Sequence, residues 1–211
     1  EHLQRQGINC PLPVRARDGK MLHRLAGRPA ALITFLNGVS YRRPTPVHCA
    51  ELGRTLAQLH LAGDGFALSR ANALDPSGWR PLYMLARDGA ESVQHGLTDL
   101  IDRELDHLEA NWPRALPQGV IHADLFPNNV LFMGQALTGV IDFYFACNDA
   151  FAYDLAICLN AWCFEADFAF NQTKSRALIA AYEAVRPLGA QERAALPLLC
   201  RGSALRFLLT R

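Results

Sequence analysis

The chain has 211 residues and a formal net charge of +1, and half of its residues are hydrophobic, which suits a soluble globular protein of one domain or one and a part. Its balanced charge argues against a nucleic-acid partner, and no apolar run reaches the roughly 18 residues that a membrane span needs. The six cysteines show no C-x-x-C pair and no metal-ligand spacing, so they are predicted to be buried thiols of a cytoplasmic protein.

The first predicted elements are a short helix and a hairpin. Residues 1–6 resemble the end of a helix that Gly7 closes. Two short apolar segments, residues 21–25 and 30–36, are joined by Ala-Gly-Arg-Pro, which predicts two paired strands. The second strand would lead directly into the turn at Asn37-Gly38.

A long helix is predicted after this hairpin. Thr45 is a typical N-cap, Pro46 is a typical first helical residue, and Gly63 marks the end. His60, near that end, is expected to be packed and hydrogen-bonded in the core. Residues 67–81 are rich in turn-forming residues and are predicted to be a loop. The apolar face of the helix is predicted to contain Cys49, Leu52, Leu56 and Leu59.

Further helices are predicted in the rest of the chain. Apolar residues recur at helical spacing over residues 97–112 and again in an apolar stretch from Leu155 to Phe164, where Trp162 is expected in the core. Asn171 is a suitable cap for a helix that runs to Pro187. Residues 191–211 alternate apolar residues with arginines, which predicts a final helix.

The middle of the chain, residues 120–143, predicts a strand, a loop and a hairpin. Pro127 fixes one backbone torsion and lacks an N–H group, so residues 124–129 should form a defined loop and not a helix. Residues 130–132 and 137–141 read as the two strands of the hairpin. This arrangement would bring three polar side chains to one end of the hairpin, those of Asp124, Asn129 and Asp142.

The three side chains have the types and spacing of a phosphotransferase site. Asp124 and Asn129 match the D-x-x-x-x-N spacing of the protein-kinase catalytic loop, where the Asp receives the acceptor's proton and the Asn holds Mg²⁺. Phosphoryl transfer from ATP spreads negative charge over the phosphate oxygens, and bound divalent cations neutralise it. Amide and carboxylate oxygens suit Mg²⁺. Asn129 and Asp142 are therefore the predicted metal ligands, and Asp124 is the predicted catalytic base.

The neighbours of these residues have less specific interpretations. His122 is interpreted as structural support, because a histidine beside the loop can hydrogen-bond backbone carbonyls and hold Asp124. An isolated H-x-D is common as a surface or core pair. An ordinary surface or core pair is the less favoured interpretation here, because Asn129 at the correct offset, the predicted hairpin and Asp142 at its end occur together. Asn128 is interpreted as a turn residue.

Together these motifs resemble a known family. His122-x-Asp124-x-x-x-x-Asn129, then Ile141-Asp142-Phe143, then Tyr153-Asp154-Leu155-Ala156 is similar to the aminoglycoside phosphotransferase and choline kinase superfamily of small-molecule kinases. Within it, the chain resembles the bacterial homoserine kinases. The residues that carry this closer resemblance are 120–130, 140–147 and 152–165, with 28–38, 43–50 and 59–63 in support.

The resemblance implies an α+β, protein-kinase-like fold that comprises the end of the small lobe and most of the helical large lobe. Residues 1–36 would belong to the small, ATP-binding lobe, and residues 37–211 to the hinge and the large catalytic lobe, truncated at its C-terminus. The cofactors would be ATP and Mg²⁺. Asp154 would be a buried acid that ties the catalytic loop to the helix behind it, and a carboxylate in a first helical turn also suits the helix dipole.

Residues 34–36 and two others are candidates for ligand contacts. The resemblance implies that backbone groups of Thr34, Phe35 and Leu36 meet the adenine, and the alternative is a plain strand followed by a turn. Arg206 has a planar guanidinium that suits an acceptor carboxylate, but a surface arginine on an amphipathic helix is an equal alternative. Tyr144 is a further candidate for the acceptor pocket.

The acceptor is expected to be a small molecule with a hydroxyl group. The resemblance implies L-homoserine and a role in threonine biosynthesis. Residue chemistry alone leaves choline, an aminoglycoside or a sugar open. A non-catalytic, kinase-like binding module is the alternative from another class.

The start of the chain lacks parts that a kinase of this kind needs. It begins with Glu1, and its two lysines, Lys20 and Lys174, do not lie on a strand beside a glycine-rich loop. We expect the chain to be a fragment whose upstream segment carries the phosphate-binding parts. The 211 residues alone should therefore bind ATP weakly.

Overall fold

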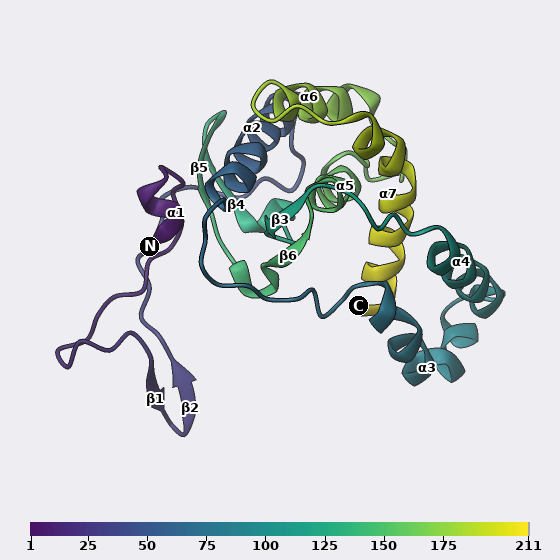
Figure 1. Cartoon of the computed structure of the whole chain (residues 1–211), viewed down its shortest axis with the longest axis horizontal. Coiled ribbons are helices and arrows are strands. Elements are labelled where there is room, and N and C mark those ends of the chain that lie inside the picture. The colour runs from purple at the N-terminus through teal and green to yellow at the C-terminus, as the bar shows by residue number, and fades with distance from the viewer. Residues whose placement is uncertain (211) are drawn as a thin grey trace.

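The computed structural model describes residues 1–210, which form helices and three small antiparallel sheets (Figure 1). The helices are α1 (His2–Arg5), α2 (Pro46–Ala62), α3 (Pro76–Val93), α4 (Leu97–Asn111), α5 (Phe151–Trp162), α6 (Gln172–Glu183) and α7 (Ala190–Thr210). The strands are β1 (His23–Leu25), β2 (Arg28–Ala30), β3 (Gln118–Ile121), β4 (Val130–Met133), β5 (Ala136–Val140) and β6 (Cys147–Ala150). Two short 3₁₀ turns are η1 (Pro127–Asn129) and η2 (Phe143–Phe145).

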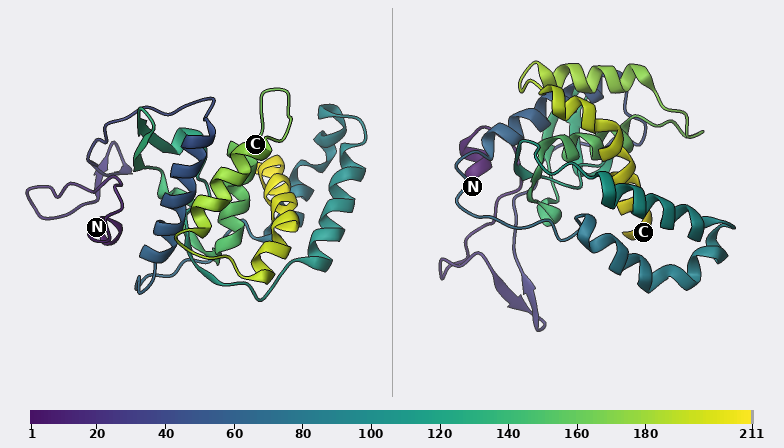
Figure 2. Two further views of the ribbon diagram at one scale, coloured as in Figure 1. Left: turned by 90° about the horizontal axis from the view of Figure 1, so that it is seen from above. Right: turned by 45° about the vertical axis from the view of Figure 1, so that its right-hand side comes forward.

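The hairpin of β1 and β2 projects from the rest of the molecule, and the α3–α4 pair lies at the opposite end (Figures 1 and 2). The prediction of a hairpin is confirmed, but the position of its second strand is wrong. The turn falls at Ala26-Gly27, where both residues have positive φ, and β2 ends at Ala30. Residues 32–34 instead hydrogen-bond to residues 12–14. They therefore pair with the segment before the hairpin and are not part of its second strand.

Helix α2 confirms the prediction made from its cap. The Thr45 hydroxyl accepts a hydrogen bond from the His48 N–H group at 3.5 Å, and the four predicted apolar residues are buried. The helix packs along α6. At Gly53 the approach is so close that a Cβ atom would lie 2.1 Å from the Leu178 carbonyl oxygen.

Helix α3 was not predicted, because the sequence around it reads as turns. The Asp75 side chain accepts a hydrogen bond from the Ser77 N–H group at 3.0 Å and caps the helix, so the predicted loop ends well before Pro81. Pro81 removes one helical donor, yet the helix continues. Its buried Trp79 and Tyr83 anchor it, and this tertiary packing outweighs the local signal.

The later helices follow the predictions, except that α6 ends at Glu183, before Pro187. Helix α5 packs against α7 in the middle of the molecule, and Trp162 is buried in the core as predicted. The six cysteines are free thiols, five of them buried and Cys200 half-buried. Over residues 1–210, no helix is long and apolar enough to cross a membrane.

Strands β3 and β6 lie near the centre of the molecule, and the β4–β5 hairpin lies beside α2, on the side toward α1 (Figure 1). Strands β4 and β5 form the predicted hairpin. Strand β3 is the predicted strand before the loop, and it pairs with β6, a partner that the sequence did not indicate. Between β3 and β4 the predicted loop is confirmed, apart from the short η1 turn at its end.

Candidate active site

The loop between β3 and β4 brings Asp124 and Asn129 into contact. The Asn129 amide nitrogen donates to the Asp124 carbonyl oxygen at 2.8 Å and lies 3.3 Å from its carboxylate oxygen Oδ2. Asn129 is only 5% exposed, whereas Asp124 is half-buried. Because the amide nitrogen is committed to Asp124, the amide oxygen of Asn129 is the atom left to face a ligand.

Asp142 lies next to this pair through the backbone of the hairpin. The Ile141 N–H group donates to the Asn129 carbonyl oxygen at 3.0 Å. Asp142 itself has a left-handed backbone, with φ 62° and ψ 63°, and its carboxylate does not cap η2, the turn that it precedes. The side chain is exposed. Positive φ is uncommon for a residue other than glycine, although Asp adopts it more often than most.

His122 links the loop that carries Asp124 to Ile141, the residue before Asp142. Its ring is fully buried, and its Nε2 atom lies 3.0 Å from the Ile141 carbonyl oxygen. Its Nδ1 atom accepts the N–H group of Asp124 at 3.3 Å. A ring that accepts at Nδ1 carries its proton on Nε2, so one neutral imidazole satisfies both contacts. These are the contacts that a supporting role of His122 would use, and that role stays a prediction.

Asp154 lies in the first turn of α5, as predicted, and binds the backbone of the loop. Its two carboxylate oxygens accept the N–H groups of His122 at 2.8 Å and of Ala123 at 2.9 Å. Ala123 has a positive φ of 62°, which a non-glycine residue adopts only when its surroundings hold it there. The carboxylate therefore stabilises the loop conformation that presents Asp124.

His60 is a member of the site that the sequence placed only in the core. From α2, its Nε2 atom lies 3.1 Å from the Asp154 carboxylate, and its Nδ1 atom lies 2.8 Å from the Tyr182 hydroxyl. Burial lowers the pKa of His60, although Asp154 opposes this. Burial alone would raise the pKa of Asp154, but His60 and the His122 N–H group hold it below its usual range. A neutral His60 that donates a hydrogen bond to an ionised Asp154 is consistent with both lowered pKa values.

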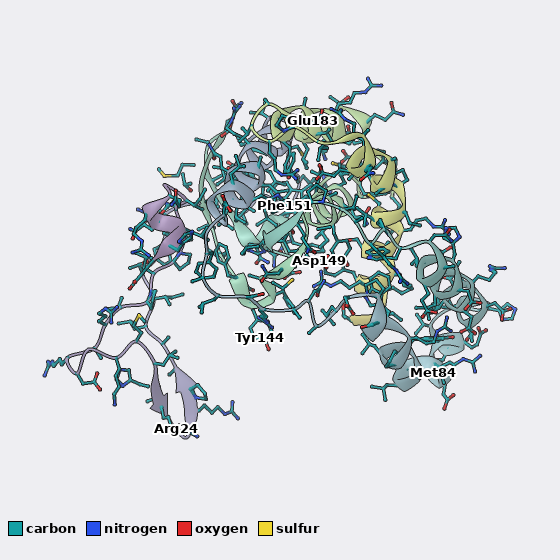
Figure 3. The ribbon with its side chains drawn as sticks, viewed as in Figure 1. Arg24, Met84, Tyr144, Asp149, Phe151 and Glu183 are labelled. Atoms are coloured by element: carbon teal, nitrogen blue, oxygen red, sulfur yellow. The ribbon has the colours of Figure 1, made fainter. Side chains whose placement is uncertain are left out.

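Residues 34–36, the predicted adenine segment, and Tyr144, a predicted acceptor residue, are largely exposed to solvent. The Thr34 N–H group already donates to the Leu12 carbonyl oxygen at 2.9 Å, while the Phe35 side chain is 90% exposed and Leu36 is half-buried. Tyr144 is exposed at the edge of the central region (Figure 3), and its carbonyl oxygen accepts a hydrogen bond from Arg70 at 2.6 Å.

Arg206 is not the surface residue that one of its two interpretations required. It is 1% exposed, and its Nη1 atom donates to the Ala123 carbonyl oxygen at 2.6 Å. Asn128, in contrast, has an exposed side chain, and its backbone carbonyl oxygen accepts a hydrogen bond from Ser40 at 3.3 Å. The loop is thus bound by side chains from α5 and α7, and His60 of α2 supports it through Asp154.

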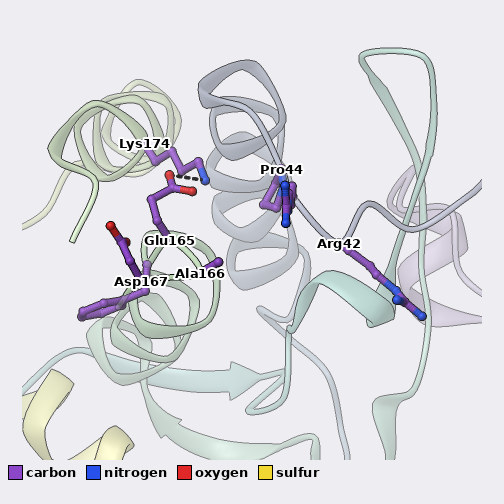
Figure 4. A pocket seen from close by; sticks show the side chains of 8 residues that line it. Arg42, Pro44, Glu165, Ala166, Asp167 and Lys174 are labelled. Atoms are coloured by element: carbon purple, nitrogen blue, oxygen red, sulfur yellow. Dashed lines mark ion pairs between the residues drawn. The ribbon is translucent and has the colours of Figure 1, made fainter. Parts of the chain in front are cut away.

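A separate charged pocket of about 490 Å³ lies between the start of α2 and the loop before α6 (Figure 4). Lys174 pairs there with Glu165 at 2.7 Å, and Figure 4 shows Arg42 pointing away from that pair. None of the predicted site residues lines this pocket. Among residues 1–210, no group of three or more His, Cys, Asp or Glu side chains is placed to hold a metal ion.

Comparisons with known proteins identify the family of the chain. Residues 1–188 match the model of a family described as "Phosphotransferase enzyme family". The chain is 65% identical over 210 residues to a homoserine kinase of Parvibaculum lavamentivorans and 60% identical to one of Mesorhizobium japonicum, and all of the chain is covered in each comparison. It spans 65% and 66% of those two relatives, which is slightly less than two thirds of their length.

Solved structures share the fold at lower identity. An aminoglycoside-3'-phosphotransferase of type VIII is 23% identical, with a TM-score of 0.66 over 95% of this chain and 76% of that one. An amicoumacin kinase, solved with AMP-PNP and Ca²⁺, is 16% identical, with a TM-score of 0.73 over 99% of this chain and 66% of that one. The predicted α+β, protein-kinase-like fold is confirmed.

Proposed function

Because the chain belongs to the phosphotransferase enzyme family, we propose that the protein transfers the γ-phosphoryl group of ATP to the hydroxyl group of L-homoserine, a step of threonine biosynthesis. The identity of 60–65% to homoserine kinases supports this acceptor. The observation that carries the reaction type is the contact between Asn129 and Asp124, together with the backbone hydrogen bond that joins Ile141, the residue before Asp142, to Asn129.

Asp124 is the base of the proposed reaction. Its half-buried carboxylate would accept the proton of the homoserine hydroxyl as that oxygen attacks the phosphoryl group. The Asn129 amide beside it and the His122 ring beneath it restrict its position. Such positioning makes a large contribution to phosphoryl transfer, which demands little covalent chemistry from the protein.

Asn129 and Asp142 fit a magnesium ion. The amide oxygen of Asn129 is left for a ligand because its nitrogen binds Asp124, and the Asp142 carboxylate is exposed and does not cap its own turn. Two protein oxygens are enough, since Mg²⁺ takes its remaining ligands from phosphate and water. When bound, the ion would neutralise negative charge on the phosphate oxygens.

The nucleotide base would meet residues 34–36, which lie between β2 and α2. We assign residues 1–36 to the small lobe and residues 37–211 to the hinge and large lobe. Within residues 34–36, the Thr34 N–H group is already engaged with Leu12, so the adenine would contact backbone groups of Phe35 and Leu36 together with the Thr34 carbonyl oxygen.

A coupled assay of ADP release with the full-length protein tests this function. We expect turnover with L-homoserine that exceeds turnover with choline, an aminoglycoside or a small sugar. The substitution Asp124→Asn should lower kcat about a hundredfold or more, because it removes the proton acceptor. Preference for another hydroxyl compound would refute L-homoserine as the acceptor and would leave the proposed phosphoryl transfer standing. Near wild-type turnover of Asp124→Asn would refute the assigned base, and no turnover with any acceptor would leave only a binding module.

A further inference from the structure

Arg206 is a charged side chain buried under the candidate active site. It lies on α7 and is 1% exposed. Its guanidinium carbon lies 4.6 Å from the centroid of the Phe207 ring and 5.5 Å from that of the Phe145 ring. Its Nη1 atom donates to the Ala123 carbonyl oxygen at 2.6 Å. Phe145 belongs to η2, the turn that follows Asp142. The arginine therefore contacts both the loop residue before Asp124 and the turn after Asp142.

The carbonyl that Arg206 binds belongs to the peptide group that carries Asp124. The N–H group of that same peptide donates to the His122 ring at 3.3 Å. The preceding peptide is held by Asp154, which accepts the Ala123 N–H group at 2.9 Å. Ala123, with its φ of 62°, is therefore fixed on one side by an anion from α5 and on the other by a cation from α7.

Burial of a guanidinium against a neutral carbonyl is unfavourable for stability alone. An arginine remains charged in a protein, and a buried charge usually requires a charged partner and full hydrogen bonding. Within residues 1–210, the Nε atom of Arg206 has no hydrogen-bond partner. The stacked phenylalanine rings repay part of this cost through cation–π contacts. What the arrangement gains is a fixed backbone immediately before Asp124.

We propose that Arg206 is a positioning residue for phosphoryl transfer, which holds Asp124 in place through the Ala123 carbonyl and does not touch the acceptor. The proposal rests on the proposed function for its kinetic consequence. This positioning role differs from the role that the sequence suggested for Arg206, which was to bind the carboxylate of the acceptor. A positioning residue changes kcat, whereas a residue that binds the acceptor in both ground state and transition state changes KM.

Steady-state kinetics of the full-length protein separate the two roles. Arg206→Ala should lower kcat about tenfold to a hundredfold, because small displacements of a catalytic group have effects of this size, while KM for ATP and for homoserine stay within about twofold of wild type. Arg206→Lys, which keeps a donor and a charge, should retain more activity. Added guanidinium ion should partly restore Arg206→Ala and should not restore Asp124→Asn.

Arg201 provides a matched control on the same helix. It is exposed and pairs with Glu104 at 2.7 Å, so Arg201→Ala should keep wild-type kcat and should not respond to guanidinium. If Arg206→Ala does not fold, Arg206→Lys and its kcat decide the question. A raised KM for homoserine with unchanged kcat, or equal kcat in Arg206→Lys and wild type without any change in the loop, would overturn the proposal.

Hydrogen–deuterium exchange tests the positioning claim without any acceptor. In Arg206→Ala or Arg206→Lys, peptides covering residues 120–130 should exchange faster than in wild type, while the Arg201→Ala variant should match wild type. Unchanged exchange in this loop would overturn the proposal even if the kinase is active. If the wild-type protein phosphorylates no acceptor, the proposed function fails, and faster exchange would still support the structural part of the claim.

Discussion

Adjacent residues can have opposite surroundings, as Asn128 and Asn129 show. The Asn129 amide binds Asp124 in a nearly buried position, whereas the Asn128 side chain is exposed. Spacing from Asp124 was enough to select Asn129, because the five-residue offset is a property of the loop itself. The sequence did not show that Arg206 binds this loop or that His60 binds Asp154 behind it, since 83 and 94 residues separate the two partners of each contact.

The two asparagines provide the first prediction. Asn129→Ala should raise the Mg²⁺ concentration needed for half-maximal activity about tenfold or more, because one of two protein oxygens for the ion is lost. Asn128→Ala is the matched control and should leave the Mg²⁺ dependence unchanged. Magnesium titrations of the full-length enzyme at saturating ATP measure both. Equal dependence in the two variants would contradict the assigned ligand.

His60 provides a prediction of pH dependence. Burial lowers the pKa of His60 in the folded state, so between that value and about 6.5 the unfolded chain binds the extra proton. The free energy of unfolding should therefore fall as pH drops below about 6.5, by up to 1.4 kcal/mol per pH unit. The lowered pKa of Asp154 adds a further loss of stability below about pH 4.

Denaturant unfolding of wild type and His60→Gln between pH 8 and pH 5 measures this effect. The variant should show a shallower fall in the free energy of unfolding, because glutamine does not titrate. His107, an exposed residue of α4, supplies the control, and His107→Gln should keep the wild-type slope. A slope unchanged in His60→Gln would show that this histidine does not titrate on unfolding.

At the scale of elements, caps and periodicity predicted most helices and the β4–β5 hairpin correctly. Thr45, Pro46 and Asn171 marked helix starts because capping is a local interaction. Helix α3 was missed because its stabilising contacts are not local: buried Trp79 packs against Trp112 at 5.1 Å between ring centroids. The second strand of the first hairpin was misplaced for a related reason, since residues 32–34 pair with residues 12–14.

The contact between α2 and α6 gives a prediction about glycine. Gly53→Ala should destabilise the fold by about 1–3 kcal/mol, because the new Cβ atom would meet the Leu178 carbonyl oxygen at 2.1 Å and push the helices apart. Gly89→Ala in α3 meets nothing within 4 Å and should stabilise by about 0.4–1 kcal/mol. Chemical denaturation of both variants measures the contrast. Similar stability of the two variants would mean that α2 and α6 are not in close contact at Gly53.

At the scale of the molecule, the site depends on three helices that converge on one loop. Helix α2 supplies His60, α5 supplies Asp154, and α7 supplies Arg206, and each of them acts on the backbone just before Asp124 or on its support. Sequence motifs identified the fold and singled out Asp124, Asn129 and Asp142 as the predicted site. They did not identify this support, because convergence of distant helices is a property of the tertiary structure.

The most direct test is a crystal structure of the full-length protein with Mg²⁺, ADP and L-homoserine. The proposal predicts the Asn129 amide oxygen and the Asp142 carboxylate at about 2.0–2.1 Å from the metal, and the Asp124 carboxylate at about 2.6–3.2 Å from the homoserine hydroxyl. A metal ion held by other side chains, or a hydroxyl group directed away from Asp124, would contradict it.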